Sequence, residues 1–287
     1  MEKICKKQIP YYNTDVCDEK EMEKIFQKHH IEGVFHFSGL KSVKDSIKHP
    51  IDYYHNNVVS TLILTKLCKK YNVNRIIFSS SATVYGDNNV PFTESMKLLP
   101  TTNPYGETKV MSEKILKDVA KSNDNLAVSI LRYFNPVGAH KSGLIGEYPK
   151  NEPNNIMPYI TKVANGELSY LEIYGNDYPT IDGTGVRDFI HVTDLAKGHI
   201  AAYIHLKKGV EVYNLGSGEG TSVLQLINTF EKVNKVDIPY KIVNRRPGDI
   251  ALCYADTSKV NEELNWEVEY SIETMCRDIW NFMKSNK

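Results

Sequence analysis

The sequence of 287 residues predicts an α/β fold organised around a parallel β-sheet. Three short apolar segments lie in the first half of the chain, at residues 33–37, 75–79 and 126–131, and are rich in β-branched and aromatic residues. Longer segments, in which apolar residues recur at helical spacing, separate them. Strands that alternate with helices of this length are typical of βαβ units, whose strands run parallel.

Three helices are expected in the first half of the chain. Residues 18–30 are charged and mildly amphipathic, whereas residues 51–71 and 105–121 carry apolar side chains at helical spacing. Ligands bind beyond the carboxyl ends of parallel strands, so the chemistry is expected just after each strand. Those segments are 38–41, 79–83 and 133–137.

The second half of the chain begins with an irregular region. Residues 138–186 are rich in Gly, Pro and Asn, which predicts a loop-rich lobe interrupted by one helix near 157–165. Regular structure is then expected to return. The expected strands are 188–192 and 210–215, and the expected helices lie near 194–206, 222–233 and 271–284.

Composition excludes several classes of protein. The 35 basic residues equal the 35 acidic ones, so there is no surplus of positive charge for binding nucleic acid. No apolar run approaches the ~20 residues that span a bilayer, which predicts no membrane partner. The five cysteines are widely spread and form no CxxC pair, which indicates free thiols in a reducing, cytoplasmic compartment and no metal site.

The segment Tyr105-Gly-Glu-Thr-Lys109 places a phenol and an ammonium on one face of a predicted helix. An ammonium beside a phenol favours the phenolate and is expected to lower the pKa of Tyr105. Such a phenolate can remove a proton from a sugar hydroxyl while hydride leaves the same carbon. A surface Tyr–Lys pair is the alternative. Ser81, at the end of a predicted strand, weakens that alternative because its hydroxyl can bind the substrate oxygen beside the phenol.

The chain resembles a known family over most of its length. In order from about residue 13 to the C-terminus, its motifs are similar to those of the UDP-hexose 4-epimerases, a branch of the extended short-chain dehydrogenase/reductase family. The segments that carry the resemblance are Phe37–Lys41, Ser79–Gly86, Pro104–Lys109, Leu131–Ala139, Pro153–Pro158 and Tyr174–Asp188.

This resemblance implies a Rossmann-like, doubly wound parallel sheet with a smaller, loop-rich C-terminal substrate lobe. Residues 1–135 would form the NAD-binding domain, to which 187–216 are expected to return, and 136–287 would bind the nucleotide sugar. The implied reaction is epimerisation at C4 of a UDP-hexose, UDP-glucose or UDP-galactose, by transient hydride transfer to bound NAD. A homodimer through the helices near 51–70 and 105–120 is also implied.

The resemblance assigns roles to individual residues. Tyr105 corresponds to the catalytic base, Lys109 to its electrostatic partner and Ser81 to the hydroxyl beside the sugar oxygen. The expected cofactor contacts are these three residues with Asp15, Val16, Phe37, Ser38, Gly39, Lys41, Asn56 and Tyr133. The expected substrate contacts are Thr83, Asn135, Asn155, Ile156, Tyr174, Arg187, Arg246, Asp249 and Cys253.

Two positions bear on the choice of substrate and reaction. Where this family carries a large Tyr at the place of Cys253, the sugar pocket is tight around the C2 substituent. The smaller Cys253 leads to the hypothesis that UDP-GlcNAc and UDP-GalNAc are also interconverted. Nucleotide-sugar 4,6-dehydratases typically carry acidic residues beside the active-site hydroxyl. Here the segment Ser81-Ala82-Thr83 has no carboxylate, which argues against that elimination.

The chain departs from the family at its beginning. Only 14 residues precede Asp15, whereas a βαβ unit takes roughly 30 or more, so the first strand, the GxxGxxG phosphate loop and the first helix are expected to be missing. The turn Gly216–Gly220 is expected to close a strand and not to bind a dinucleotide. An alternative function is therefore a non-catalytic fragment that binds UDP-sugar weakly without NAD.

Overall fold

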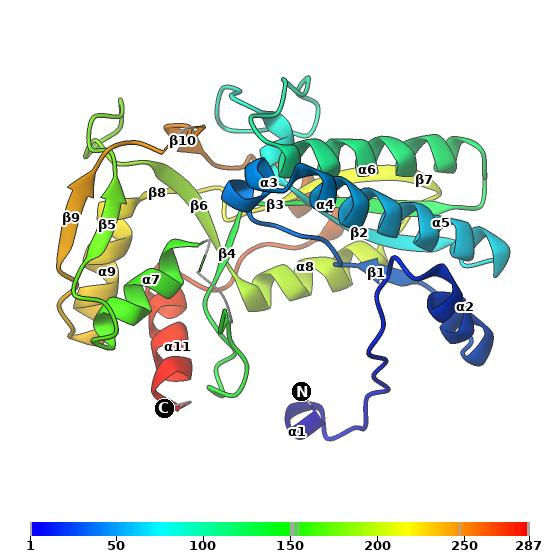
Figure 1. Cartoon of the computed structure of the whole chain (residues 1–287), viewed down its shortest axis with the longest axis horizontal. Coiled ribbons are helices and arrows are strands. Elements are labelled where there is room, and N and C mark those ends of the chain that lie inside the picture. The colour runs from blue at the N-terminus through cyan, green and yellow to red at the C-terminus, as the bar shows by residue number, and fades with distance from the viewer. Residues whose placement is uncertain (1, 150–152, 154, 247, 286–287) are drawn as a thin grey trace.

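The computed structural model describes residues 2–149, 153, 155–246 and 248–285. Its first sheet contains four parallel strands, which confirms the predicted α/β class (Figure 1). The strands run in the order β1-β2-β3-β7, and β2 and β3 pair along their whole length. Their bounds are Val34–His36 for β1, Arg75–Ser81 for β2, Ala127–Tyr133 for β3 and Gly209–Leu215 for β7.

Helices cover both faces of this sheet, as a doubly wound fold requires. Side chains alternate along β2: Ile76 and Phe78 pack against helices α2, α5 and α6, whereas Ile77 packs against α8 and α10. Each face is therefore buried under its own apolar cluster. The bounds are Glu19–Lys28 for α2, Ser60–Lys70 for α5, Pro104–Lys121 for α6, Val192–Ile204 for α8 and Ser258–Leu264 for α10.

The segment predicted as one helix over 51–71 is helical but not uniform. It consists of α4 (Pro50–Tyr54), a π-helical turn (His55–Val59) and α5, preceded by α3 (Val43–Lys48). The π-turn contains two consecutive asparagines, Asn56 and Asn57, a residue type that has poor helix propensity. Turns of this kind inside α-helices are frequent at functional sites.

The second lobe is built on shorter strands. β4 (Asn135–Val137), β6 (Val186–His191) and β10 (Leu252–Cys253) run parallel in the order β10-β6-β4, and β8 (Gly220–Ser222) pairs antiparallel with β6. β5 (Leu171–Tyr174) pairs with β9 (Tyr240–Val243). The short strands β4, β5, β8, β9 and β10, of two to four residues, were not expected from the sequence.

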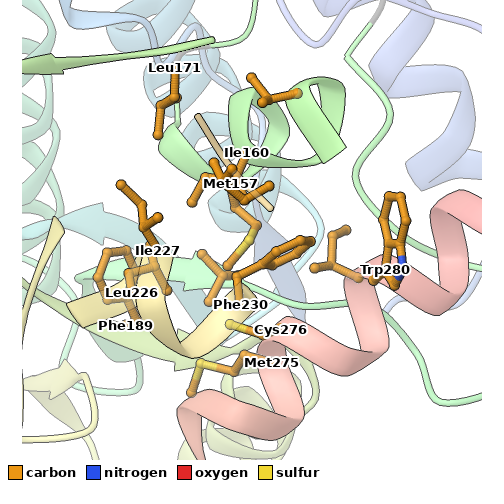
Figure 2. Packing of buried hydrophobic residues seen from close by; sticks show 14 of the residues in the cluster. Met157, Ile160, Leu171, Phe189, Leu226, Ile227, Phe230, Met275, Cys276 and Trp280 are labelled. Atoms are coloured by element: carbon orange, nitrogen blue, oxygen red, sulfur yellow. The ribbon is translucent and has the colours of Figure 1, made fainter. Parts of the chain in front are cut away.

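Three helices close the core of the second lobe: α7 (Ile156–Ala164), α9 (Val223–Asn234) and α11 (Ile272–Ser285). Figure 2 shows Met157, Phe230 and Trp280 converging from these three helices into one apolar cluster. This packing holds β6, and the arginine that it carries, firmly against the rest of the chain.

The remaining short elements are α1 (Glu2–Cys5) and a 3₁₀ turn, η2 (Ala82–Tyr85). Within the described residues, β1 has one strand neighbour, β2, so it forms an edge of the first sheet. In the same part of the chain, no helix is long and apolar enough to cross a membrane.

Candidate active site

Helix α6 positions Tyr105 and Lys109. Asn103 caps the helix by accepting the amide of Gly106 at 2.9 Å, and Pro104 occupies the first turn, where its missing N–H costs nothing. Because Tyr105 and Lys109 are four residues apart, they share a helix face. That face is turned inward: Tyr105 is 9% exposed and Lys109 is 5% exposed.

The carboxyl end of β2 meets this face of α6. Lys109 Nζ donates a hydrogen bond to the carbonyl of Ser79 at 2.7 Å. Ser81, two residues further on, hydrogen-bonds the Tyr105 phenol and also accepts the hydroxyl of Thr83 at 3.0 Å. The structure therefore brings Ser81, Tyr105 and Lys109 together, with Thr83 beside them.

The expected effect of Lys109 on the phenol needs a correction. Burial raises the pKa of Tyr105 above its ordinary value, and the hydrogen bond from Ser81 offsets part of this rise. It is Lys109 whose pKa falls, to about 8, because burial penalises the ammonium. Lys109 Nζ lies 6.0 Å from the Tyr105 ring centroid and is directed at the Ser79 carbonyl. Lys109 thus loses its proton near pH 8, before the phenol of Tyr105 does.

A buried asparagine holds the loop after β1 against α6. Asn57 in the π-turn accepts the amide of Leu40 at 2.7 Å and donates to the carbonyl of Leu40 at 3.0 Å. It also donates to Thr108, the neighbour of Lys109, at 2.9 Å. A Cβ added to Gly39 would lie 3.5 Å from Lys109 Nζ and 3.2 Å from Asn57 Oδ1, so only glycine leaves this approach open.

The other residues expected at the cofactor side line the same edge. Ser38 hydrogen-bonds His36 at 3.0 Å, and burial lowers the pKa of His36 to about 3, so this imidazole is neutral. Phe37 packs against His199, with ring centroids 4.9 Å apart, and His199 in turn hydrogen-bonds the Tyr133 hydroxyl. Tyr133 also hydrogen-bonds Ser79, next to Lys109.

A second group of residues gathers in the other lobe. Arg246 stacks on Tyr174, with its guanidinium carbon 4.6 Å from the ring centroid, and donates to Asp249 at 2.9 Å. Burial raises the pKa of the Tyr178 phenol, and the charges of Asp249, Arg187 and Arg246 also act on it. Guanidinium groups suit a diphosphate because they bind its oxygens in a bidentate manner.

Two further features complete this second group. Arg245, which the sequence did not single out, lies 4.0 Å above the Tyr178 ring and donates to Asp177 at 2.7 Å. Cys253 on β10 pairs in register with Arg187 on β6, so the position expected to line the sugar pocket lies beside a diphosphate-binding candidate.

The turn Gly216–Gly220 does not offer a phosphate site. Its amides at Ser217 and Gly218 donate to the buried carboxylate of Asp188 at 2.6 and 3.0 Å, and Ala255 donates to the same carboxylate at 3.1 Å. A Cβ on Gly216 would lie 2.3 Å from Asp188. An internal carboxylate already fills this nest of amides, in agreement with the expected structural turn.

Comparisons with known proteins decide the family. The profile described as GDP-mannose 4,6 dehydratase matches residues 2–279. UDP-glucose 4-epimerase of Pasteurella multocida is 52% identical over 286 residues, which cover 99% of this chain and 85% of that protein, and the Caenorhabditis elegans enzyme is 51% identical. The crystal structure of the Bifidobacterium longum epimerase, in complex with NAD+ and UDP, superposes with a TM-score of 0.96 at 53% identity, covering 99% of this chain and 86% of that one.

The chain belongs to the UDP-glucose 4-epimerase family. Its fold is accordingly the Rossmann-like fold of the extended short-chain dehydrogenases/reductases.

Other residues that the epimerase family resemblance singled out make contacts outside the Ser81–Tyr105–Lys109 group. Asp15 is exposed and accepts the amide of Cys17 at 2.8 Å; the thiol of Cys17 in turn contacts the carbonyl of Asn56 at 3.5 Å. Asp15, Val16 and Asn56 therefore sit together beside the π-turn. The exposed Lys41 makes an ion pair with Glu147 at 3.3 Å.

The remaining substrate candidates of this epimerase-family chain lie at element ends in the second lobe. Asn135 opens β4, which pairs with β6, the strand that carries Arg187. Asn155 is the N-cap residue of α7 and makes no side-chain capping hydrogen bond, and Ile156 begins that helix. The neighbouring Asn154 lies outside the described residues.

Sequence reasoning missed Asn57 and His199 as site residues. Asn57 had one signal, its presence in a helical segment where asparagine has poor propensity. His199 had none, because its contact with Tyr133 joins residues 66 positions apart.

Proposed function

We propose that this chain interconverts UDP-glucose and UDP-galactose by epimerisation at C4, with NAD as the bound cofactor. The observation that carries the proposal is the buried group of Ser81, Tyr105 and Lys109 at the carboxyl edge of β2. A carbinol oxygen placed beside Ser81 and Tyr105 meets both a hydrogen-bond donor and a proton acceptor. Relatives that are about half identical over nearly the whole chain carry the name of this activity.

The side chains perform the proton chemistry. Tyr105 takes the proton of the 4-hydroxyl as the hydrogen on the same carbon departs, and it returns a proton when the hydrogen comes back. Lys109, whose Nζ lies 6.0 Å from the Tyr105 ring centroid, would support the phenolate by its positive charge, and Ser81 would orient the oxygen. The chemistry that NAD supplies is a hydride acceptor at C4 that returns hydride to the opposite face of the sugar.

The residues present fit the nicotinamide end of that cofactor. Gly39 leaves an approach to Lys109 that a Cβ would fill. Ser38, Gly39 and Tyr133 lie around this approach, and Tyr105 and Lys109 close it from α6. In the turn Gly216–Gly220, the amides of Ser217 and Gly218 are already bound by Asp188, so this turn supplies no pyrophosphate cradle.

The second lobe supplies the residues that would bind the substrate. Arg187 and Arg246 would hold the diphosphate, and Tyr174, on which Arg246 stacks, offers an aromatic face to the base. With the diphosphate held, the 4-keto sugar can turn about its diphosphate link and present its other face. This division of labour supports an NAD-binding domain at 1–135, with β7 and α8 packed onto it, and a nucleotide-sugar lobe at 136–287.

Two other functions are less well supported. A 4,6-dehydratase needs an acid or base next to the active-site hydroxyl, but Thr83 occupies that position and hydrogen-bonds Ser81 at 3.0 Å. A non-catalytic UDP-sugar-binding fragment would need the arginines but not the buried Tyr105–Lys109 pair. The retained pair therefore favours an enzyme.

The experiment that tests the proposed function is direct. The purified chain is incubated with UDP-galactose, with and without added NAD, and UDP-glucose is measured by chromatography. Denatured protein is examined in parallel for released NAD by absorbance. Formation of UDP-glucose in proportion to the cofactor bound supports the proposal. Cofactor-loaded chain that forms no UDP-glucose contradicts it.

Acceptance of N-acetylated sugars is a separate proposal that rests on Cys253. A cysteine at this half-buried position leaves more space than a tyrosine beside Arg187. We expect turnover of UDP-GalNAc by the wild type, and its selective loss in Cys253→Tyr while UDP-galactose is still converted. Parallel initial-rate measurements with both sugars check this. Good conversion of UDP-galactose by the wild type without any of UDP-GalNAc would sink the hypothesis.

A homodimer through the α4–α5 and α6 surfaces is also proposed. Ile51 on α4, Leu62 on α5 and Met111 on α6 are 80%, 47% and 38% exposed, so these helices present apolar side chains outward. A twofold contact between such faces would cover them. Sedimentation equilibrium over a range of concentrations measures the oligomeric state.

The five free thiols support a cytoplasmic location.

A further inference from the structure

A buried carboxylate that the proposed chemistry does not use stands one helical turn beyond Lys109. Glu113 is 1% exposed and shares the inward face of α6 with Lys109. Its Oε1 accepts hydrogen bonds from Ser80 Oγ at 2.7 Å and from Arg132 Nε at 2.9 Å. Its Oε2 accepts from Arg132 Nη2 at 2.7 Å and from Lys117 at 3.3 Å. This is a bidentate ion pair inside the protein, where surface screening does not weaken it.

Arg132 connects this pair to the rest of the first sheet. It lies on β3, immediately before Tyr133, and its guanidinium carbon is 4.7 Å from the Tyr85 ring centroid. The Tyr85 hydroxyl donates to Asn214 on β7 at 2.6 Å. One connected set of contacts thus joins α6 to β2, β3 and β7.

Ser80 links Glu113 to the reacting side chains. The residue before it, Ser79, offers the carbonyl that receives Lys109, and the residue after it, Ser81, offers the hydroxyl that hydrogen-bonds Tyr105. When Ser80 is tied to Glu113, the serine triplet is fixed in register with the helix that carries Tyr105 and Lys109. Proton transfer tolerates little displacement, because a shift of about 1 Å can cost a hundredfold in rate.

Glu113 also supplies the charge that opposes the desolvation of Lys109. Burial lowers the pKa of Lys109 to about 8, and Glu113 is the carboxylate that raises it. Two further titratable groups packed near Lys109 are neutral: burial lowers the pKa of His36 on β1 to about 3 and raises the pKa of Tyr133 on β3. Burial also raises the pKa of Tyr53 on α4, which acts on Tyr105.

We propose that Glu113, locked by Arg132, is a positioning residue of the epimerisation: it fixes Ser79–Ser81 against α6 and places its negative charge one helical turn beyond Lys109. The inference rests on the proposed function for its catalytic meaning. The physical reason is that Tyr105 and Lys109, once they have lost one proton between them, can share the remaining protons in two ways. Phenolate with ammonium is productive, phenol with amine is not, and a negative charge behind Lys109 favours the first.

The test begins on the ligand-free protein. Glu113→Gln removes the charge but keeps a carbonyl oxygen for Ser80. Glu94→Gln is the matched control, because Glu94 accepts the Asn214 amide at 2.7 Å and acts on Tyr85, in the same network, but not on Lys109. The pKa of Lys109 is measured by NMR of the lysine side chains, with the resonance assigned from Lys109→Arg. We expect a decrease of about one pH unit in Glu113→Gln and none in Glu94→Gln.

The pH dependence of turnover distinguishes a change in the Lys109 pKa from a loss of packing alone. In Glu113→Gln, the acid limb of the pH profile with UDP-galactose moves about one unit lower, while the plateau kcat falls about tenfold because the productive proton arrangement becomes about tenfold rarer. KM for UDP-galactose is unchanged, since the arginine group is untouched. A fall in kcat with an unmoved limb and an unmoved Lys109 pKa would overturn the proposal.

A second variant guards against misfolding. If Glu113→Gln leaves Arg132 unpaired and does not fold, Glu113→Leu/Arg132→Met removes both buried charges together. The same direction of shift in the Lys109 pKa is expected, and a wild-type pKa in this variant would refute the assignment. Because the NMR titration needs no turnover, it remains informative if the chain proves not to be an epimerase.

Discussion

Tyr105→Phe is expected to lower kcat by about 10²- to 10⁴-fold, the usual contribution of a positioned proton donor and acceptor. The substitution removes one buried hydroxyl and keeps the ring that packs beneath the end of β2. Binding of UDP should be unchanged, because the arginines proposed to hold the diphosphate, Arg187 and Arg246, belong to the other lobe and not to α6. Steady-state kinetics with UDP-galactose, together with calorimetric titration of UDP, measures both quantities.

Tyr213→Phe is the matched control for this experiment. Tyr213 is also buried, and its hydroxyl donates to Glu263 at 2.9 Å on the face of the sheet opposite to α6. Its loss should reduce stability modestly, by about 1 kcal/mol for one hydrogen bond, and leave kcat unaltered. Wild-type turnover in Tyr105→Phe would remove Tyr105 from the reaction, whatever its surroundings.

The sequence predicted the elements whose signal is local. β2 and β3 are continuous apolar runs, and the helices that follow them have regular apolar spacing, so their positions agreed to within a few residues. The pair Tyr105 and Lys109 was found because a separation of four residues defines a shared helix face. Ser81 was identified because it lies at the end of a predicted strand, where its hydroxyl can lie beside the helix face that carries Tyr105 and Lys109.

Features that depend on distant contacts were not predictable. Asn57 acts on the backbone of Leu40 and on Thr108, and no local pattern connects these three residues. The predicted direction of the Tyr105 pKa shift was wrong for the same reason. Charge proximity along one helix suggested a lowered pKa for Tyr105, whereas burial, which only the tertiary fold determines, raises it and lowers that of Lys109 instead. Desolvation is a property of the packed interior, and spacing along a helix does not encode it.

Arg132→Met is expected to produce the largest loss of stability, about 3–5 kcal/mol, because it leaves the carboxylate of Glu113 buried without its bidentate partner. At roughly 2–4 °C per kcal/mol for a chain of this size, the melting temperature should fall by about 10 °C. Ser80 and Lys117 still contact Glu113, but neither replaces two parallel guanidinium hydrogen bonds. Thermal and urea unfolding of wild type and variant measure the difference.

The double variant distinguishes the net contribution of the Glu113–Arg132 pair to stability from the destabilisation caused by leaving one of its charges buried without a partner. In Glu113→Leu/Arg132→Met neither charge remains to be desolvated, so most of the lost stability should return. Lys197→Met is the exposed counterpart: Lys197 and Glu269 are 2.5 Å apart but their side chains are 40% and 60% exposed, so water screens the pair and its loss should leave the melting temperature nearly unchanged. Equal destabilisation by the single and double variants would mean that packing volume, and not charge pairing, accounts for the contribution of Arg132. A stable double variant with impaired turnover would instead show that the buried pair is kept for the geometry of the active site and not for the stability of the fold.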